Sequence, residues 1–279
     1  MKFFTHDSTF TTIINSILKR IFSLVLFALT KRGVSRFLLL TPSCLKKQVI
    51  FDRYYRRFIS IYIRDYIDFC TVLQIYVSDD YGIEKFKRAS EIKNFYSKIV
   101  QNGKSPLIID CGGNIGLATK YFQYNYPEAT ILCIEPDIQN ISQAKANNTN
   151  SKIKFFTGAI GSLEGTGDII DPGLGNNAYR IESKEKGQIK IISINQLLNE
   201  YSQNLYIPFI VKIDIEGSEF DLFSKNTEWV DKFPLLIVEL HDWMLPKTAN
   251  SKNFIRTIAP LERDFLHHGE NIFSISNKH

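Results

Sequence analysis

Residues 107–117 read LIIDCGGNIGL and combine a strand, a carboxylate, a glycine turn and a helix start in one short run. The apolar residues 107–109 are typical of a strand that is covered on both faces. Asp110 ends this strand, and glycines at positions 112, 113 and 116 then permit a tight turn and close approach of the backbone to a ligand. A helix is predicted from about residue 115 to 122. The stretch therefore predicts a ligand site at a strand end of an α/β sheet.

A dinucleotide-binding turn has the pattern G-x-G-x-x-G and presents helix amides to a pyrophosphate. Cys111 stands at the first glycine position, so only the second half of that pattern is met. The Asp110 carboxylate would repel a phosphate, but it suits a ligand with an ammonium or sulfonium charge. The turn therefore favours S-adenosylmethionine over NAD, and an NAD-dependent oxidoreductase is the enzymatic alternative.

A second acidic residue follows the next predicted strand. Residues 129–134 (ATILCI) form this strand, and Glu135-Pro136 ends it. Glu135 lies 25 residues after Asp110, near the separation of about 20 expected between a glycine turn and the carboxylate that binds ribose hydroxyls. Glu135 is therefore predicted to bind a ribose.

The third stretch is residues 208–219, PFIVKIDIEGSE. Asp214 and Glu216 share one face of an extended segment, because side chains alternate with period two. Lys212 lies in an otherwise apolar strand, so it needs a carboxylate partner if it is buried; an exposed position at a sheet edge is the alternative. Glu219 is predicted to lie in the first turn of a helix, where the helix dipole favours an anion.

On these motifs, together with CIEPD at 133–137 and LLIVELHDW at 235–243, the chain resembles FkbM-type S-adenosylmethionine-dependent methyltransferases over residues 80–279. The resemblance implies an α/β, Rossmann-like class I methyltransferase fold with a mainly parallel central sheet and helices on both faces. It also implies O-methylation of a hydroxyl on a saccharide, a glycolipid precursor or a related small metabolite. The implied cofactor-binding residues are Asp110, Gly112, Gly113, Asn114, Gly116, Glu135, Pro136, Ala159 and Asp214.

Methyl transfer to a hydroxyl benefits from a general base. His241, at the carboxyl end of the predicted strand 235–240, is the main candidate by side-chain type. Asp214 and Glu216 are alternatives, either as the base or as partners that orient His241. We assign no dedicated metal ligands, but a divalent cation bound by Asp214, Glu239 and His241 is an alternative to metal-free catalysis.

The chain is expected to divide into an N-terminal extension, residues 1–78, and a methyltransferase domain, residues 79–279. Residues 1–64 hold 12 Lys and Arg against 2 Asp and Glu, a formal charge of +10, whereas the whole chain carries +5. The extension is aromatic, and the apolar spacing over residues 51–76 favours helices while also permitting strands. The longest uncharged apolar run, residues 21–30, is shorter than the roughly 20 residues of a membrane-spanning helix.

Two interpretations of this extension remain open. Its elements pack on the catalytic sheet or on a second subunit of a homo-oligomer, or they bind an anionic membrane surface through basic and apolar side chains. RNA binding is less favoured, because the sequence contains no nucleic-acid-binding motif. A non-catalytic methyltransferase-fold protein that binds membrane or RNA through this extension is the functional alternative. We expect a cytoplasmic protein, either free or peripheral at the inner face of a membrane.

The remaining pattern alternates strands and helices, which indicates a parallel sheet. Residues 161–187 are rich in Gly, Asp, Asn and Ser, and indicate either an insertion over the site or a surface hairpin. A helix at 252–266 and a strand at 271–276 are predicted to complete the sheet. Four cysteines without C-x-x-C spacing indicate neither a zinc site nor a disulfide framework.

Overall fold

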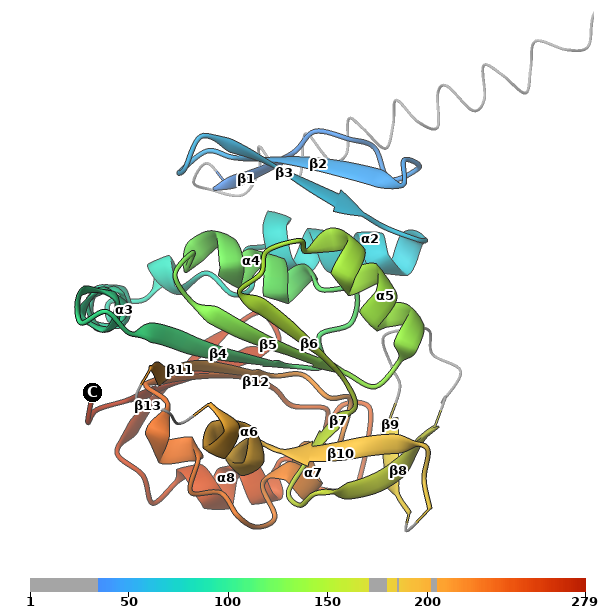
Figure 1. Ribbon diagram of the computed structural model, residues 1–279, viewed down its shortest axis with the longest axis vertical. Helices are drawn as coiled ribbons and strands as arrows, with labels where there is room; N and C mark the ends of the chain where they lie inside the picture. Colours follow the sequence, from blue (N-terminus) through green and yellow to red (C-terminus); the bar gives the residue numbers. More distant parts are fainter. Residues whose placement is uncertain (1–34, 171–179, 185, 202–204) are drawn as a thin grey trace, which may run out of the picture. The chain divides into compact units, whose positions relative to one another are not determined.

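The computed structural model describes residues 35–170, 180–184, 186–201 and 205–279 (Figure 1). The chain divides into two compact units, residues 1–79 and residues 80–279. This division differs by one residue from the expected boundary. The apolar and basic segment at residues 1–34 lies outside the described residues.

The described part of the first unit is a small antiparallel sheet followed by a helix. The strands, in the sheet order β1-β2-β3, are β1 (Phe37–Leu39), β2 (Lys47–Asp52) and β3 (Arg57–Tyr62). Helix α2 (Tyr66–Val72) follows and continues into a π-helical turn, η1 (Leu73–Val77).

Of the two alternatives left open for residues 51–76, the favoured helical one is therefore wrong for the strand residues up to Tyr62, and a helix is found only from Tyr66. The apolar residues of this segment also fit a helical spacing, but Ile59 and Ile61 are both fully buried in β3, two residues apart. This period of two is that of a strand with one covered face. The helix begins only after Asp65, whose side chain accepts hydrogen bonds from two amides of the first turn.

The second unit is built on a seven-stranded sheet with the order β13-β14-β12-β11-β4-β5-β6. Its strands are β4 (Ser105–Cys111), β5 (Thr130–Glu135), β6 (Ile153–Thr157), β11 (Tyr206–Ile213), β12 (Leu235–Glu239), β13 (Arg263–His268) and β14 (Asn271–Ser276). Strand β14 runs antiparallel to both of its neighbours, and the other neighbouring pairs run parallel. The predicted α/β fold with a mainly parallel central sheet is confirmed.

Helices cover both faces of this sheet (Figure 1). One face carries α4 (Leu117–Asn125) and α5 (Ile138–Asn147), and the other carries α6 (Ile194–Glu200), α7 (Glu219–Leu222) and α8 (Lys252–Ile258). Before β4 come η2 (Ile83–Lys85) and α3 (Ala89–Gln101), and before β12 comes η3 (Val230–Lys232).

Alternation along the central strands divides their side chains between the two faces. Ile109 and Val211 belong to the apolar core that also contains residues of α6, α7 and α8. Their sequence neighbours Asp110 and Lys212, which are paired in register, project to the opposite face. The sheet thus places one acidic and one basic side chain side by side in its interior.

A smaller sheet flanks the main one, with the order β7-β10-β8-β9. Its strands are β7 (Ala159–Gly161), β8 (Gly165–Ile170), β9 (Arg180–Ser183) and β10 (Ile189–Ser193). Strands β8 and β9 pair antiparallel. The described residues of segment 161–187 thus agree with the hairpin alternative, and residues 171–179 lie outside the described part.

The predicted helix at 252–266 is wrong beyond Ile258. Pro260 lacks the amide hydrogen that would continue the helix. Residues 263–268 instead form β13, which pairs antiparallel with β14 at the end of the sheet.

Candidate functional site

The glycine loop lies at the carboxyl ends of β4 and β5. Gly112 and Gly116 both have a φ of 78°, in the left-handed region that glycine adopts without steric cost. A Cβ atom on Gly112 would overlap the carbonyl oxygen of Asp214. The amides of Gly112 and Gly113 donate to the carbonyl oxygen of Ile134 at 3.0 and 2.9 Å. The loop backbone therefore contacts both β5 and the segment that follows β11.

Glu135, the last residue of β5, is buried beside this loop. Its Oε2 accepts a hydrogen bond from the Asn114 amide at 2.9 Å, and its Oε1 accepts from the Asp137 amide and the Asn140 side chain at 3.0 and 3.1 Å. Burial raises the pKa of Glu135, and these three hydrogen bonds oppose that rise. The structure thus brings Glu135 and Asn114, two of the predicted cofactor-binding residues, into direct contact.

Pro136 and Ala159 both lie near the backbone of Glu135, the first by sequence and the second through the pairing of β5 with β6. The Gly158 amide donates to the carbonyl oxygen of Glu135 at 3.0 Å. Ala159 follows as the first residue of β7 and is 5% exposed, whereas Pro136 directly follows Glu135. Glu135, which is predicted to bind the ribose, and Ala159, another predicted cofactor-binding residue, are therefore adjacent.

Asp110 lies beneath the loop, in the protein interior. Its side chain is fully buried, and its Oδ2 accepts a hydrogen bond from the Thr119 hydroxyl at 2.6 Å. Its Oδ1 lies 3.3 Å from the Nζ of Lys212. The direct pairing of Asp110 with a ligand's positive charge stays a prediction, because in this structure the carboxylate faces these two protein groups.

Lys212 connects the loop to the strand ends. Its side chain is 2% exposed, and Nζ donates to the carbonyl oxygens of Gly112 and Cys111 at 2.8 and 3.3 Å. Nζ also lies 3.4 Å from Asp214 Oδ2. Burial alone would lower the pKa of Lys212, but the Asp214 and Asp110 carboxylates help to raise it well above its usual value. Of the two sequence alternatives for Lys212, the structure supports the buried residue with carboxylate partners.

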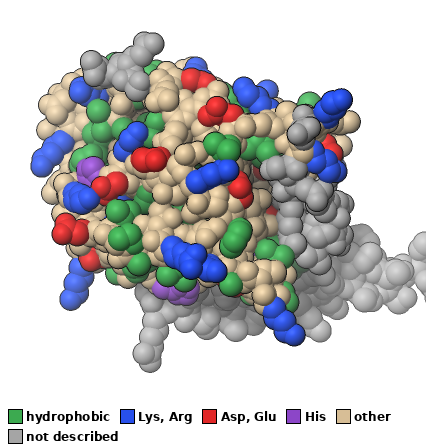
Figure 2. Space-filling model, turned by 90° about the horizontal axis from the view of Figure 1, so that it is seen from below, with side chains coloured by type: hydrophobic (Ala, Val, Ile, Leu, Met, Phe, Trp, Pro, Cys, Tyr) green, Lys and Arg blue, Asp and Glu red, His purple; other side chains and the backbone are tan. Residues whose placement is uncertain are grey.

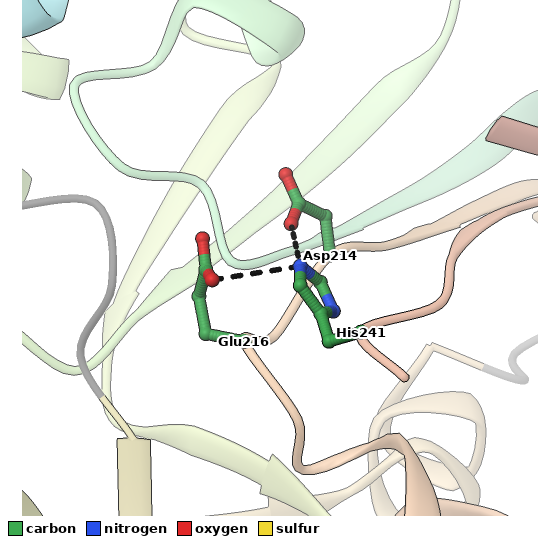
Figure 3. A group of neighbouring side chains, drawn as sticks. All are labelled: Asp214, Glu216 and His241. Atoms are coloured by element: carbon green, nitrogen blue, oxygen red, sulfur yellow. Dashed lines mark ion pairs between the residues drawn. The ribbon is translucent and has the colours of Figure 1, made fainter. Parts of the chain in front are cut away.

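Three carboxylates surround one nitrogen of His241, just beyond the ends of β11 and β12. His241 Nε2 lies 3.6 Å from Asp214 Oδ1, 3.5 Å from Glu216 Oε2 and 3.5 Å from Glu239 Oε1. Figure 3 shows the Asp214 and Glu216 side chains directed at this nitrogen. One ligand atom each of Asp214, Glu216 and His241 lies within 4.8 Å of the others. The structure thus gathers all three predicted catalytic side chains into one cluster.

Glu219 orients His241 from the opposite side. Its Oε1 lies 3.0 Å from His241 Nδ1, and its Oε2 accepts from the Asn250 side chain at 2.9 Å. Glu219 is fully buried and His241 is 1% exposed. The sequence indicated a helix-dipole position for Glu219 and no link to His241. Glu219 is the first residue of α7, as that prediction requires, but the short helix turns its side chain inward.

The excess of carboxylates shifts the ionisation of the cluster. Burial and the charge of Asp214 raise the pKa of Glu216 to about 8 and that of Glu239 to about 9. Burial alone would lower the pKa of His241, but the hydrogen bond to Glu219 and the surrounding negative charges raise it to about 9. At neutral pH the imidazole therefore carries a proton, which disfavours His241 as a simple general base in this state.

Two further features mark the same strand ends. Glu216 has a φ of 54°, an uncommon conformation for a residue with a side chain, and such strain concentrates at functional sites. Tyr81 is buried, and burial raises the pKa of its hydroxyl, with a smaller rise from the carboxylates of Asp214 and Asp110. No motif in the sequence indicated Tyr81.

The molecular surface adds two observations. Figure 2 shows the face that carries α6 and α8, on which Lys and Arg side chains are interspersed with Asp and Glu. Such mixed charge does not favour a nucleic-acid interface on that face. None of the helices in the described part of the chain is long and apolar enough to span a membrane.

Comparisons with known proteins find similarity to methyltransferases. The curated relatives include Methyltransferase 1 of Beauveria bassiana, which is 25% identical over 48% of this chain and 64% of its own length. They also include hexuronic acid methyltransferase AglP of Haloferax volcanii, 25% identical over 50% of this chain and 57% of its own length. A solved structure, human methyltransferase 10 domain containing protein, covers 77% of this chain and 96% of its own at 13% identity and a TM-score of 0.35.

The family comparison covers more than half of the chain. The model of the methyltransferase FkbM domain matches residues 110–266, which include the glycine loop, Glu135 and the His241 cluster. The chain therefore belongs to the FkbM methyltransferase family.

Proposed function

We propose that this protein is an S-adenosylmethionine-dependent O-methyltransferase that acts on a hydroxyl of a saccharide, a glycolipid precursor or a related small metabolite. One observation carries the proposal: the backbone of the glycine loop is in direct contact with the His241 cluster. A side chain on Gly112 would collide with Asp214, which belongs to the cluster. A cofactor cradled by the loop and an acceptor held at the cluster would therefore lie next to each other.

The residues around the loop suit S-adenosylmethionine. The tight turn at Gly112 lets the loop backbone pack closely against the strand ends, beside the place where the cofactor would bind. The Glu135 carboxylate can accept hydrogen bonds from two ribose hydroxyls, and Ala159 offers an apolar surface to adenine. S-adenosylmethionine supplies an activated methyl group on a sulfonium. The protein has then mainly to hold the acceptor oxygen in line with that methyl group, which can contribute several kcal/mol.

The cluster supports a hydroxyl as the acceptor. A hydroxyl must lose its proton during transfer, and a cluster of carboxylates and an imidazole is a suitable place to take up that proton. The relative from Haloferax volcanii is named a hexuronic acid methyltransferase, and this name supports a saccharide acceptor. The structured cofactor loop and the intact cluster favour this proposal over a non-catalytic protein with the same fold.

Calorimetric titration with S-adenosylmethionine and with NADH tests the proposal, on the wild type and on Glu135→Ala. We expect binding of S-adenosylmethionine alone, at least tenfold weaker in the variant. Incubation with uronic acid glycosides and methyl-labelled S-adenosylmethionine then tests transfer to oxygen. Failure of the folded wild type to bind S-adenosylmethionine would contradict the proposal and favour the non-catalytic alternative.

We further propose that the N-terminal unit contributes a peripheral membrane contact, which would suit a lipid-linked acceptor. Tyr54, Tyr55 and Phe58 are 65%, 46% and 64% exposed. The guanidinium groups of Arg36 and Arg57 lie 5.2 and 4.6 Å from the ring centre of Tyr55. Exposed aromatic side chains beside arginines are suited to the headgroup region of an anionic membrane.

A further inference from the structure

We propose that Asp214, Glu216 and His241 bind a divalent transition-metal cation, with Mn²⁺ as the best-suited ion and Glu239 at the margin of the site. The binding site depends only on the geometry of the cluster. Its role in catalysis rests on the proposed function, because the cation would act on the acceptor hydroxyl.

The spacing of the cluster fits a shared cation better than a set of hydrogen bonds. The three oxygens lie 3.5–3.6 Å from His241 Nε2, which is longer than the 2.7–3.2 Å of ordinary N–H···O hydrogen bonds. Ligand atoms about 2.1 Å from a common cation lie about 3.0–3.4 Å apart. The separations from Nε2 are slightly longer, and the ligand atoms of Asp214, Glu216 and His241 all lie within 4.8 Å of one another, so inward movement of the flexible carboxylates would complete the shell.

The orientation of His241 is the second, independent observation. A metal-binding histidine commonly donates its other ring N–H to a carboxylate, which fixes the tautomer and aims the free nitrogen at the metal. Glu219 occupies that position, 3.0 Å from Nδ1, and is itself held by Asn250. His241 is 1% exposed, and Figure 3 shows its Nε2 directed at Asp214 and Glu216. The imidazole is thus buried and held with one nitrogen facing the cluster.

Charge and donor type select the cation. Asp214, Glu216 and Glu239 bring three carboxyl groups to one point, while the Lys212 ammonium group is shared with Asp110. A divalent cation would favour the ionised form of these carboxyl groups and offset the negative charge that they then carry. Carboxylate ligands suit Mg²⁺, Ca²⁺ and Mn²⁺, whereas imidazole suits first-row transition metals. Mn²⁺ satisfies both donor types.

Such a cation would act on the acceptor. A metal-bound hydroxyl has a lowered pKa and a fixed position, so it loses its proton more readily. In this arrangement His241 is a metal ligand. The proton of the acceptor hydroxyl would pass to the Glu239 carboxylate at the margin of the site, while the methyl group passes from the sulfonium to the acceptor oxygen and leaves a thioether. The acceptor class would then be a hydroxyl with a second oxygen donor nearby, as in a sugar diol or a uronic acid.

The inference is tested by titrating Mn²⁺ into the full chain after a chelator has removed any bound metal. Electron paramagnetic resonance measures the concentration of the unbound Mn²⁺ ion. We expect one saturable site in the micromolar range, and Glu216→Gln and Asp214→Asn should each weaken it by about 10–100-fold. Glu262→Gln removes an exposed carboxylate outside the cluster and should leave the affinity unchanged. Thermal unfolding without metal identifies a variant that fails to fold, in which case the other variant decides.

The two proposals fail in distinguishable ways. Glu135→Gln should bind S-adenosylmethionine more weakly and bind Mn²⁺ as the wild type does. Glu216→Gln should bind Mn²⁺ more weakly and bind S-adenosylmethionine as the wild type does. The metal site would be overturned if the folded wild type showed no saturable Mn²⁺ binding. It would also be overturned if both cluster variants bound Mn²⁺ with the affinity of the wild type. Loss of S-adenosylmethionine binding alone would overturn the proposed function and leave the metal site standing.

Discussion

Lys212 and Asp110 face each other across the neighbouring strands β11 and β4, with Nζ 3.3 Å from Oδ1 and side chains that are 2% and 0% exposed. Removing one partner of a buried ion pair leaves an uncompensated charge in the interior. We expect Lys212→Met to lower the free energy of unfolding by about 3–5 kcal/mol, as measured by urea denaturation. The double variant Lys212→Met/Asp110→Asn should regain part of the lost free energy of unfolding. If the losses of the two single variants add up to that of the double variant, the two residues are not coupled.

Gly112→Ala should impair both folding and cofactor binding. Its φ of 78° costs a residue with a side chain about 1–2 kcal/mol, and its Cβ would also overlap the Asp214 carbonyl oxygen. Gly103→Ala is the matched control, because Gly103 has a φ of 70° with nothing within 4 Å of the added atom. Equal destabilisation of the two variants in urea would contradict the close contact between loop and cluster.

The affinity for S-adenosylmethionine should depend on the ionisation of Glu135. Burial raises the pKa of this carboxyl group, and only the carboxylate accepts hydrogen bonds from both ribose hydroxyls. Affinity should therefore fall as the pH decreases through that raised pKa, at a higher pH than for an exposed glutamate. Calorimetry on Glu135→Gln should show a lower affinity, by about tenfold or more, without this pH dependence. The same pH profile in both proteins would exclude Glu135 as its source.

Glu219→Gln should weaken Mn²⁺ binding although Glu219 is not itself a proposed ligand. The substitution replaces the charged partner of His241 Nδ1, so the imidazole loses part of its orientation. We expect an approximately 10–100-fold lower Mn²⁺ affinity. Glu228→Gln, which changes an exposed carboxylate, serves as the control. Lower stability with unchanged Mn²⁺ affinity would limit Glu219 to a structural role.

Phe58→Ser combined with Tyr62→Ser should reduce sedimentation of the protein with vesicles that contain phosphatidylserine. Both side chains are exposed, at 64% and 47%, on the basic N-terminal sheet. Phe265→Ser, which removes a 50% exposed phenylalanine from the second unit, should have no effect. Equal vesicle binding by all three proteins would exclude this sheet as a membrane contact.

In the second unit, the sequence predicted the bounds of strands and helices well where a short stretch of chain contains the whole pattern. Strand β5 lies within a residue of its predicted bounds, because its apolar run is continuous and ends at Glu135-Pro136. The favoured helix over residues 51–62 and the prediction for 263–268 were wrong, since short apolar segments fit both periods and the pairing partner decides between them. Strands β3 and β13 owe their conformation to β2 and β14, which lie beside them in the sheets.

The glycine turn and Glu135 follow from spacing within single stretches of the chain, because backbone conformation is a local property. Asp214 and Glu216 reach one site, but strand alternation does not place them there, because β11 ends at Ile213 and Glu216 lies in a turn with a φ of 54°. The pairing of Lys212 with Asp110 and the contact of Glu219 with His241 join residues that are 102 and 22 positions apart. Neither pair forms until β4, β11 and β12 lie side by side, which places their carboxyl ends at one edge of the sheet. Side-chain type and the position at a strand end predicted His241 as a base, with a metal ligand as the alternative. Its burial among four carboxylates favours the metal ligand, because ionisation and orientation depend on neighbours that the folded sheet supplies.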